Sequence, residues 1–250
     1  MEYDLKGHVA FVTGASSGLG RHFSQLLAHA GAAVALAGRR IERLNEVKVG
    51  IEAAGGRAAA IELDVTDATQ IAPALDKAEA ALGPIDILVN NAGLSVFGLA
   101  ADISAADFDK VIATNLRAPF LLATEVARRL VAKKRDGRII NIASIGSFRV
   151  LPGVTAYCVS KAGLAMMTQC LAREWARKGI NVNALCPGFI ETELNAEWFA
   201  SEKGKAQIEG FPRKRLAKES DLDGMFLLLA SPASRTITGS LLTVDDGQSL

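Results

Sequence analysis

The sequence of 250 residues is poor in the residue types from which metal sites and disulfide frameworks are built. Its three cysteines have no metal-ligand spacing, and any pairing among them leaves one thiol over. Such thiols are typical of a reducing compartment, so we expect a cytoplasmic protein without a disulfide framework. The three histidines lie outside every motif described below, and we interpret them as structural or surface residues. We predict no metal site.

The sequence also lacks an excess of either charge and any long apolar run. Lysine and arginine number 28 against 27 aspartates and glutamates, which predicts no footprint for nucleic acid or an anionic membrane. No apolar run approaches the roughly 20 residues that a membrane-spanning helix needs. The segment Met1–Lys6 has no apolar core of the kind found in a signal peptide. We therefore expect a soluble intracellular protein.

Hydrophobic residues make up 50% of the sequence, enough for the core of one α/β domain over residues 1–250. Short apolar, β-branched runs recur at His8–Thr13, Ala33–Gly38, Ala58–Leu63, Ile85–Asn90, Arg138–Ile142, Asn181–Leu185 and Leu241–Val244. Such runs favour strands buried on both faces. Between them lie segments of helical period, including Gly20–Ala30, Arg40–Ala54 and Ala105–Ala132. The alternation predicts a doubly wound parallel sheet with helices on both faces, which binds ligands at the carboxyl ends of its strands.

The segment 191–215 departs from this alternation. It places Trp198, Phe199 and Phe211 among charged residues, directly after a predicted strand. A surface helical hairpin is one interpretation. A substrate lid is the other, and we favour it because long excursions at a ligand-binding edge are usually functional.

A glycine-rich loop follows the first predicted strand directly. It reads Thr13-Gly14-Ala15-Ser16-Ser17-Gly18-Leu19-Gly20, and a predicted helix begins at its end. Glycines permit the tight turn and let backbone N–H groups approach a pyrophosphate, to which the helix amino terminus adds a favourable partial charge. A plain turn would need one glycine rather than three. The loop predicts a dinucleotide site formed by Gly14, Ser16, Ser17, Gly18, Leu19 and Gly20.

The second predicted strand ends at Gly38 without an acidic residue, and Arg39 and Arg40 follow. Enzymes that select NAD commonly place a carboxylate here, on the ribose 2′-hydroxyl. A guanidinium instead binds a phosphate in bidentate fashion. We predict NADP(H) rather than NAD(H), with Arg39 as the main contact, because Arg40 can also be a solvated residue at a helix start.

Two further strand ends carry candidate cofactor contacts. Asp64, which precedes Val65, can accept a hydrogen bond from adenine or cap the next helix, and both interpretations stay open. After the fourth predicted strand, Asn91, Ala92 and Gly93 offer small residues that let the backbone pass close to a ribose.

A tyrosine and a lysine form a candidate acid–base pair. Tyr157 and Lys161 are four residues apart, so in a helix they share one face. A free tyrosine has a pKa near ~10, and a neighbouring cation lowers it by favouring the phenolate. Ser144 lies thirteen residues before the tyrosine. Alone, the tyrosine–lysine spacing proves little, because it occurs by chance in many helices.

Taken together, these residues resemble the short-chain dehydrogenase/reductase family. The shared motifs, in the family's order and approximate spacing, are Thr13-Gly14-x-x-x-Gly18-x-Gly20, Asn90-Asn91-Ala92-Gly93, Asn115, Ser144, Tyr157-x-x-x-Lys161 and Pro187-Gly188. The resemblance covers nearly the whole chain. It implies a single-domain Rossmann-type fold and an oxidoreductase that uses a nicotinamide cofactor.

The resemblance also implies a role for four catalytic residues. Tyr157 would exchange a proton with the substrate oxygen, and Ser144 would polarise that oxygen. Lys161 would lower the pKa of the tyrosine and bind the nicotinamide ribose. Asn115 would hold a water that links the lysine to solvent. A scaffold protein on the same fold, a remote alternative, typically loses the tyrosine or the lysine, and this chain retains both.

Residues after the sixth predicted strand are implied to border the nicotinamide and the substrate. Pro187 and Gly188 would flank the nicotinamide, and Thr192 would reach its carboxamide or the phosphates. Phe189 would contact the substrate beside Ser144 and Tyr157. Other candidate lining residues are Ser95, Ile145, Phe148, Arg149, Val154, Trp198 and Phe199. Arg149 is either an anion anchor or an exposed loop cation, and we favour the latter.

The substrate is less defined than the reaction. Residues 188–193 and 137–142 resemble the 3-oxoacyl-(acyl carrier protein) reductase branch, in which basic residues near the site mouth dock the carrier, as Arg135 and Lys178 could here. The lid differs from that branch in its length and its tryptophan. We predict an NADP(H)-dependent reductase of a ketone, possibly a 3-oxoacyl thioester of acyl carrier protein or coenzyme A. The alternative is an NAD-dependent dehydrogenase of a sugar, polyol or hydroxy acid.

The family usually forms homotetramers through its two long helices and last strand. Ala162, Gly163, Ala165 and the apolar tail Leu241–Leu250 suit such close packing. We therefore expect a homotetramer.

Overall fold

The computed structural model describes residues 3–191 and 196–250, which form a seven-stranded parallel sheet. The strand order is β3-β2-β1-β4-β5-β6-β7, so the chain builds outward from β1 to one edge and then returns to extend the other side. The strands are β1 (Val9–Thr13), β2 (Ala33–Gly38), β3 (Arg57–Glu62), β4 (Ile87–Asn90), β5 (Gly137–Ile142), β6 (Ile180–Pro187) and β7 (Leu241–Val244). This topology confirms the predicted doubly wound sheet.

The central strands are apolar along their whole length because both faces of the sheet are covered. Every residue of β1, β2, β4 and β6 is buried. The sequence predicts most strand ends to within two residues. β6 continues to Pro187, beyond its predicted end at Leu185, because Cys186 and Pro187 pair with Thr243 and Val244 of β7.

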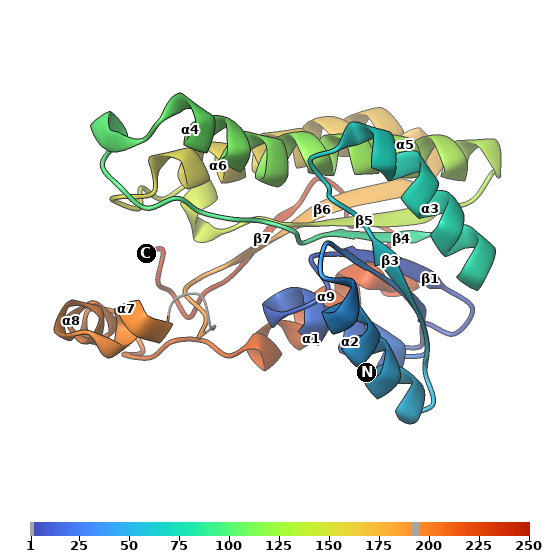
Figure 1. The fold of residues 1–250 in the computed structure, drawn as a ribbon, viewed down its shortest axis with the longest axis horizontal. Coiled ribbons are helices and arrows are strands. Elements are labelled where there is room, and N and C mark those ends of the chain that lie inside the picture. The colour runs from blue at the N-terminus through green and yellow to red at the C-terminus, as the bar shows by residue number, and fades with distance from the viewer. Residues whose placement is uncertain (1–2, 192–195) are drawn as a thin grey trace.

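Helices cover the sheet in two layers (Figure 1). One layer holds α3 (Ala68–Leu82), α4 (Ala105–Ile112), α5 (Ala118–Ala132) and α6 (Thr155–Trp175). The other holds α1 (Gly18–His29), α2 (Ile41–Ala53) and α9 (Asp223–Ala230). Each layer has its own apolar core against the sheet, and in the second Phe23 stacks on Phe226 with ring centroids 4.0 Å apart. Among the described residues, no helix has both the length and the apolar character to cross a membrane.

The predicted helix Ala105–Ala132 is observed as α4 and α5 joined by a π-turn at Ala113–Arg117. A π-turn inserts one extra residue, and such turns are frequent at functional sites. Asn115 lies in this turn and is fully buried.

Two small residues that we expected at a subunit contact are wholly or partly buried within the chain. Ala165 is buried, and a Cβ atom on the half-buried Gly163 would lie 2.8 Å from the side chain of Leu116 in the π-turn. Gly163 thus lets α6 approach the π-turn closely, and the expected subunit contact stays a prediction. Ala162 is exposed.

The segment 191–215 contains two short helices, α7 (Ala196–Ala200) and α8 (Glu202–Glu209), which stand to one side of the sheet (Figure 1). Its ends are joined at the base. Glu191 N donates to Ala217 O at 3.0 Å, and Ala217 N donates to Phe189 O at 3.0 Å. The excursion is therefore a closed loop on a paired stem, and its action as a lid stays a prediction.

A buried carboxylate holds the amino-terminal edge of the sheet together. Asp86 Oδ2 lies 2.9 Å from His8 Nδ1 and 3.0 Å from Arg135 Nη2, and its Oδ1 accepts from Val9 N at 2.9 Å. The hydrogen bond with Asp86 raises the pKa of His8. This network links the starts of β1, β4 and β5, which are far apart in sequence.

Candidate active site

The strand order reverses between β1 and β4, and one hydroxyl joins these two strands at their carboxyl ends. Thr13 Oγ1 accepts from Asn91 N and from Ala92 N at 3.0 Å each, and it donates to Val89 O at 3.3 Å. Asn91 Nδ2 donates to Thr13 O at 2.9 Å. The loop after β1 and the loop after β4 are thus held together at the switch point, where doubly wound sheets bind their ligands.

The glycine-rich loop packs too tightly for side chains at two positions. Gly14 has φ +67°, and a Cβ atom there would lie 2.9 Å from Asn91 Nδ2. A Cβ atom on Gly20 would lie 2.2 Å from Gly14 O. At Gly18, by contrast, an added Cβ would meet no atom within 4 Å. The loop is closed toward the protein and open on the side where a phosphate would approach the first turn of α1.

Arg40 contacts the glycine-rich loop directly. Its Nη2 donates to Ser16 Oγ and to Ser17 Oγ, each at 2.8 Å. Arg40 is exposed at the start of α2, as the interpretation of a solvated residue has it, and its side chain also joins the end of β2 to the loop. Arg39 is exposed beside it, and its charge contributes to a lowered pKa of Asp64. A shallow hollow between α1 and α2 adds further cations and is lined by Ser16, Arg21, Gln25, Arg43, Glu46 and Val47.

Asp64 does not cap the helix that follows β3. Its Oδ1 accepts from Thr66 N at 2.9 Å and from Thr66 Oγ1 at 2.7 Å, which forms a local turn. The cap of α3 is Asp67, which accepts from Thr69 N at 2.9 Å. The hydrogen bonds from Thr66 lower the pKa of Asp64. The cap interpretation is thus wrong, while the adenine interpretation stays a prediction together with the role of Val65.

Tyr157 and Lys161 lie on one face of α6, as their spacing predicts. Lys161 Nζ lies 5.6 Å from the centroid of the Tyr157 ring and donates to Ile142 O, at the end of β5, at 2.6 Å. Ser144, two residues beyond Ile142, is hydrogen-bonded with Tyr157 and accepts from Gly146 N at 3.0 Å. A serine hydroxyl, a phenol and an ammonium therefore meet at the carboxyl end of β5.

The pKa of Tyr157 differs in direction from our expectation. Burial raises it, and the hydrogen bond with Ser144 opposes that rise. Burial also lowers the pKa of Lys161 to about 8. The lysine lies over the ring face and bonds to a backbone carbonyl rather than to the phenol oxygen, so the expected lowering of the tyrosine pKa is not observed in this arrangement.

Asn115 uses its side chain to hold the loop after β4. Its Oδ1 accepts from Leu94 N at 2.9 Å, and its Nδ2 donates to Leu94 O at 2.8 Å and to Ser160 Oγ at 3.0 Å. An added Cβ on Gly93 would lie 3.4 Å from Asn115 Oδ1 and 3.7 Å from Lys161 Nζ. The loop after β4 therefore passes directly beside the lysine. Sequence analysis missed Ser160, although its position just before Lys161 was a usable signal.

A family model of short chain dehydrogenases matches residues 8–203 of the chain. The chain belongs to the short-chain dehydrogenase/reductase family. It is therefore an oxidoreductase, as the sequence motifs predict.

Known relatives of this short-chain dehydrogenase/reductase align over almost its whole length. It is 35% identical to gluconate 5-dehydrogenase of Gluconobacter oxydans, over 98% of this chain and 96% of that protein. It is also 35% identical to a 3-oxoacyl-(acyl-carrier-protein) reductase of Thermotoga maritima, over 97% and 98% of the two chains. Its fold matches a gluconate 5-dehydrogenase from Burkholderia cenocepacia in complex with NADP and tartrate, with a TM-score of 0.94, 33% identity, and coverage of 99% and 97%.

Phe189, which the sequence predicts to contact the substrate, is held in this dehydrogenase/reductase through both backbone and ring. Phe189 N donates to Gln248 Oε1 at 2.6 Å. Its ring meets Phe199 edge-on at 5.7 Å and stacks on Phe211 at 5.5 Å. Sequence analysis missed Gln248, because no motif connects the tail after β7 to residue 189. Pro187 and Gly188 precede Phe189 at the end of β6, while Thr192 lies outside the described residues.

Other predicted lining residues divide into buried and exposed groups. Ile145 is buried, and Ser95 has a buried hydroxyl without a partner among the described residues. Phe148 and Arg149 are exposed, and Arg149 Nη1 donates to Leu250 O at 3.5 Å. Arg149 thus fits the exposed loop cation that we favoured.

Arg135 and Lys178 lie far from this edge. They precede β5 and β6 respectively, so both belong to the amino-terminal edge of the parallel sheet. Ser144 and Phe189 follow the same two strands at the opposite edge. The expectation that these cations flank the mouth of the site is wrong for this chain.

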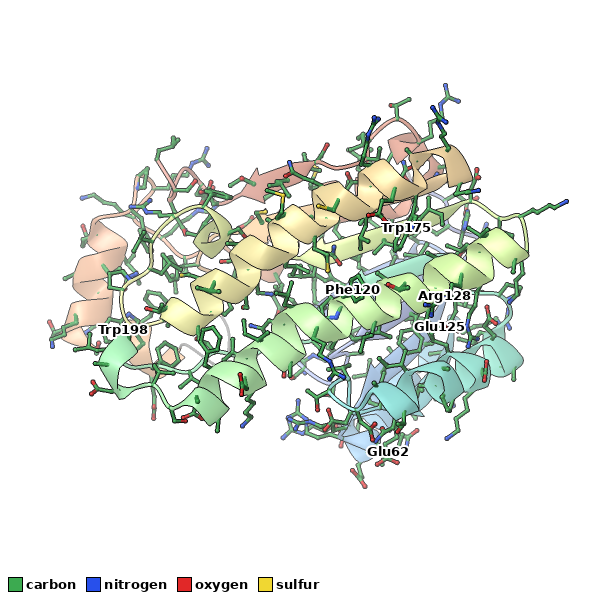
Figure 2. The ribbon with its side chains drawn as sticks, turned by 90° about the horizontal axis from the view of Figure 1, so that it is seen from above. Glu62, Phe120, Glu125, Arg128, Trp175 and Trp198 are labelled. Carbon is green, nitrogen blue, oxygen red and sulfur yellow. The ribbon has the colours of Figure 1, made fainter. Side chains whose placement is uncertain are left out.

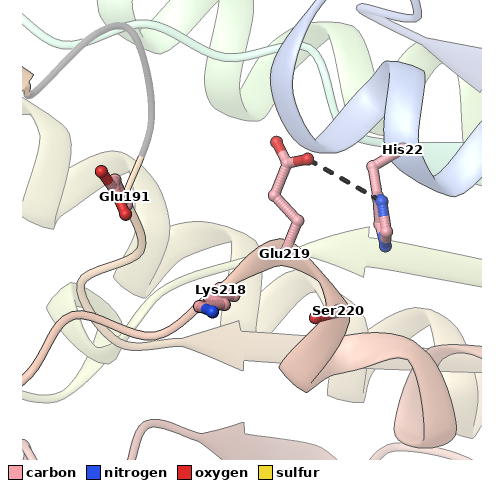
Figure 3. Close-up of a pocket in the computed structure, with 5 residues that line it drawn as sticks. All are labelled: His22, Glu191, Lys218, Glu219 and Ser220. Atoms are coloured by element: carbon pink, nitrogen blue, oxygen red, sulfur yellow. Dashed lines mark ion pairs between the residues drawn. The ribbon is translucent and has the colours of Figure 1, made fainter.

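A hollow beside α1 lies next to the stem of the lid (Figure 3). It is lined by His22, Glu191, Lys218, Glu219 and Ser220. His22 Nδ1 lies 3.8 Å from Glu219 Oε2, and His22 Nε2 lies 2.6 Å from Asp223 Oδ1. These contacts fix the helix of the glycine-rich loop to the segment that follows the lid.

Proposed function

We propose that this dehydrogenase/reductase interconverts a ketone and a secondary alcohol, with NADP(H) as the cofactor. The observation that carries the proposal is the meeting of Ser144, Tyr157 and Lys161 beside Gly93, at the edge where the glycine-rich loop also opens. A phenol and a serine hydroxyl that share one hydrogen bond can both point at a single substrate oxygen. The open face at Gly18 and the cations around Ser16 suit a dinucleotide.

When bound, NADP(H) would supply or accept the hydride. The residues of the chain would orient the substrate and manage the proton. Ser144 and Tyr157 would donate hydrogen bonds to the carbonyl oxygen, and Tyr157 would give its proton as negative charge develops there. A raised pKa keeps the phenol protonated at neutral pH, ready for reduction. Lys161, with a pKa of about 8, is mainly an ammonium at pH 7 and would hold the ribose where the backbone at Gly93 approaches.

The preference for NADP(H) is supported by the cations at the end of β2. Arg40 donates to both serines of the glycine-rich loop, and Arg39 stands exposed beside it. In the sequence no acidic residue follows Gly38 at the end of β2, where a carboxylate would repel a 2′-phosphate. Structures of relatives that contain NADP, such as that from Burkholderia cenocepacia, agree with this assignment.

Arg39→Asp should invert the cofactor preference. We expect kcat/KM with NADPH to fall roughly 10- to 100-fold, because a charge-assisted phosphate contact is replaced by repulsion, while kcat/KM with NADH holds or rises. Absorbance assays with both cofactors measure the ratio.

Tyr157→Phe serves as the catalytic control and should lower kcat by about 10²- to 10⁴-fold while NADPH still binds. An unchanged cofactor ratio contradicts the assignment of Arg39, and substantial turnover by Tyr157→Phe contradicts the acid–base role.

A second candidate function is the oxidation of a sugar acid. The supporting observation is the similarity to gluconate 5-dehydrogenases, in sequence and in structure. Reduction of a 3-oxoacyl thioester is supported by a similar relative, but the two cations expected to dock the carrier, Arg135 and Lys178, lie at the opposite edge of the sheet. The catalytic residues suit all three reactions, so the substrate must be distinguished by the surface around them.

A further inference from the structure

Large apolar side chains are exposed around the candidate active site. Five of them, which we call the apolar rim, have exposed fractions of 50% or more and are Phe97 (73%), Leu99 (70%), Phe148 (54%), Val150 (85%) and Trp198 (50%). Single exposed apolar residues are ordinary, whereas a concentration of them at one place marks a binding surface. We therefore expect the apolar rim to bind another molecule.

The rim is continuous with the segment that carries the candidate catalytic residues. Phe148 and Val150 lie between Ser144 and Tyr157 in the connection from β5 to α6. Phe97 and Leu99 lie in the connection from β4 to α4, which Gly98 N fixes to the first connection by donating to Gly153 O at 3.0 Å. Two parts of the rim are thus tied together, and one of them lies in the connection that joins Ser144 to Tyr157.

The segment 191–215 carries the fifth exposed residue. Trp198 stands on α7, and in the view from above it lies toward the same end of the molecule as the loops before α4 and α6 (Figure 2). The next residue, Phe199, contacts the ring of Phe189, which follows the end of β6. The segment that carries Trp198 is thus packed against the predicted substrate residue Phe189, while the indole itself donates to Gln207 of α8.

The rim side chains themselves offer almost no hydrogen bonds to a ligand, and the cation among them, the exposed Arg149, donates to Leu250 O at 3.5 Å. Phenylalanine, leucine and valine side chains have no polar atoms, and the single donor of Trp198, its Nε1, already donates to Gln207 Oε1 at 2.9 Å. A polyhydroxylated substrate placed here would lose hydrogen bonds to water without replacement, which penalises binding. An alkyl or aryl group would instead gain from leaving water.

From this contrast we infer that the substrate of this enzyme is a ketone, or the matching secondary alcohol, with an apolar chain or ring of several carbons that binds the apolar rim. The inference rests on the proposed reaction at Ser144 and Tyr157. It separates this chain from relatives named for gluconate, whose substrate is a polyhydroxy acid.

A homologous series of ketones tests the inference. The wild-type enzyme is assayed with NADPH and 2-alkanones from butanone to nonanone, which share one reacting carbonyl, and with 5-dehydrogluconate as the polyhydroxy competitor. We expect kcat/KM to rise about threefold per added methylene over the first carbons and then level off. Leu99→Ser and Phe148→Ser should flatten this rise. Val49→Ser, a matched change of an exposed valine on α2 with 63% exposure, should leave the whole series unaltered.

The outcomes separate this inference from the proposed reaction. Turnover of the alkanones with no dependence on chain length, or a higher kcat/KM for 5-dehydrogluconate than for nonanone, overturns the apolar substrate and leaves the reaction standing. Failure to oxidise NADPH with every ketone overturns both. If a second copy of the chain covers the rim instead, Leu99→Ser will change the mass in light scattering while the series stays flat, which also overturns the inference.

Discussion

At the scale of single residues, the ammonium of Lys161 is the group of the candidate site whose burial is least favourable. The residue is buried, with 5% exposure, and among the described residues its ammonium contacts the Ile142 carbonyl and the ring of Tyr157 rather than a carboxylate. Moving an ammonium out of water is unfavourable unless a partner compensates for it. Burial accordingly lowers its pKa to about 8. A buried charge that is unfavourable for folding is typical of a catalytic or binding residue.

Lys161→Met should therefore raise the free energy of unfolding at pH 7 by roughly 1–3 kcal/mol, while it abolishes or severely lowers activity. The folded pKa is about 8 and the ordinary value is 10.5. Between these values the unfolded wild type binds more protons, so the stability of the wild type rises with pH and the advantage of the variant shrinks. Urea denaturation of both proteins at several pH values from 7 to 10.5 measures this. A difference that does not vary with pH would contradict the burial of the charge.

The sequence predicts the catalytic side of the site better than the substrate side. Tyr157, Lys161 and Ser144 belong to a spaced motif, and the glycine-rich loop is a contiguous one. Gln248 and Ser160 act through contacts that join residues 189 and 248 or 115 and 160, and no short-range pattern encodes such pairs. Asp64 was ambiguous because an aspartate at a strand end can form a local turn as easily as a helix cap.

At the scale of elements, the stem of the lid is fixed by one aspartate in the tail after β7. Asp246 has φ +53°, a conformation that favours glycine, yet its carboxylate lies 2.7 Å from Arg215 Nη2 and 3.7 Å from Arg213 Nη1. Arg215 also pairs with Asp221 at 3.2 Å. Non-glycine residues in this conformation persist where the surrounding contacts hold them. The tail thus holds the returning end of the lid while Gln248 holds its start at Phe189.

Asp246→Asn should loosen the lid without unfolding the protein. Asparagine tolerates the same backbone conformation but removes the charge that pairs with Arg215. We expect trypsin to cleave at the lysines of α8 roughly threefold to tenfold faster, with little change in Tm, because local opening becomes easier. The matched control is Glu209→Gln, which removes an exposed ion pair to Lys214 in the same segment. Equal cleavage rates for Asp246→Asn and the control would exclude the aspartate as an anchor.

The elements themselves were largely predictable, because burial imposes periodicity on the sequence. Strands covered on both faces read as unbroken apolar runs, and each confirmed strand lies where such a run occurs. The break within Ala105–Ala132 was not predictable, since one additional residue hardly disturbs an amphipathic pattern. The lid helices are short and charged, so periodicity could not locate them.

At the scale of the whole molecule, the outer face of the α4–α6 layer is incompletely covered by this chain. Phe120 on α5 is 46% exposed and Met166 on α6 is 61% exposed, and Figure 2 shows the face on which Phe120 lies. Exposed large apolar residues on a helix layer indicate contact with another surface. We propose that a second copy of the chain covers this face, as part of the homotetramer expected from the sequence.

Light scattering at micromolar concentration should therefore give about four times the 26.3 kDa of one chain. Phe120→Glu combined with Met166→Glu should yield smaller species, because charges at the centre of an apolar interface are left unpaired. Val49→Glu, on the opposite layer, should leave the mass unchanged. A wild-type monomer would refute the assembly, and an intact tetramer of the double variant would refute this face as its interface.

The π-turn at Ala113–Arg117 links the candidate active site to the proposed assembly surface. Asn115 points inward to Leu94 and Ser160, while Phe120, in the first turn of α5, is exposed on the outer side of the same continuous rod. Deleting the one surplus residue would restore regular winding and rotate one half of the rod against the other by about 100°. Either the Asn115 amide would lose its hydrogen bonds to Leu94 and Ser160, or the Phe120 ring would leave the outer face of the helix layer. The extra residue therefore fixes the rotation of Asn115, at the candidate active site, relative to Phe120, on the proposed assembly surface. Neither side chain could be turned about the helix axis without moving the other.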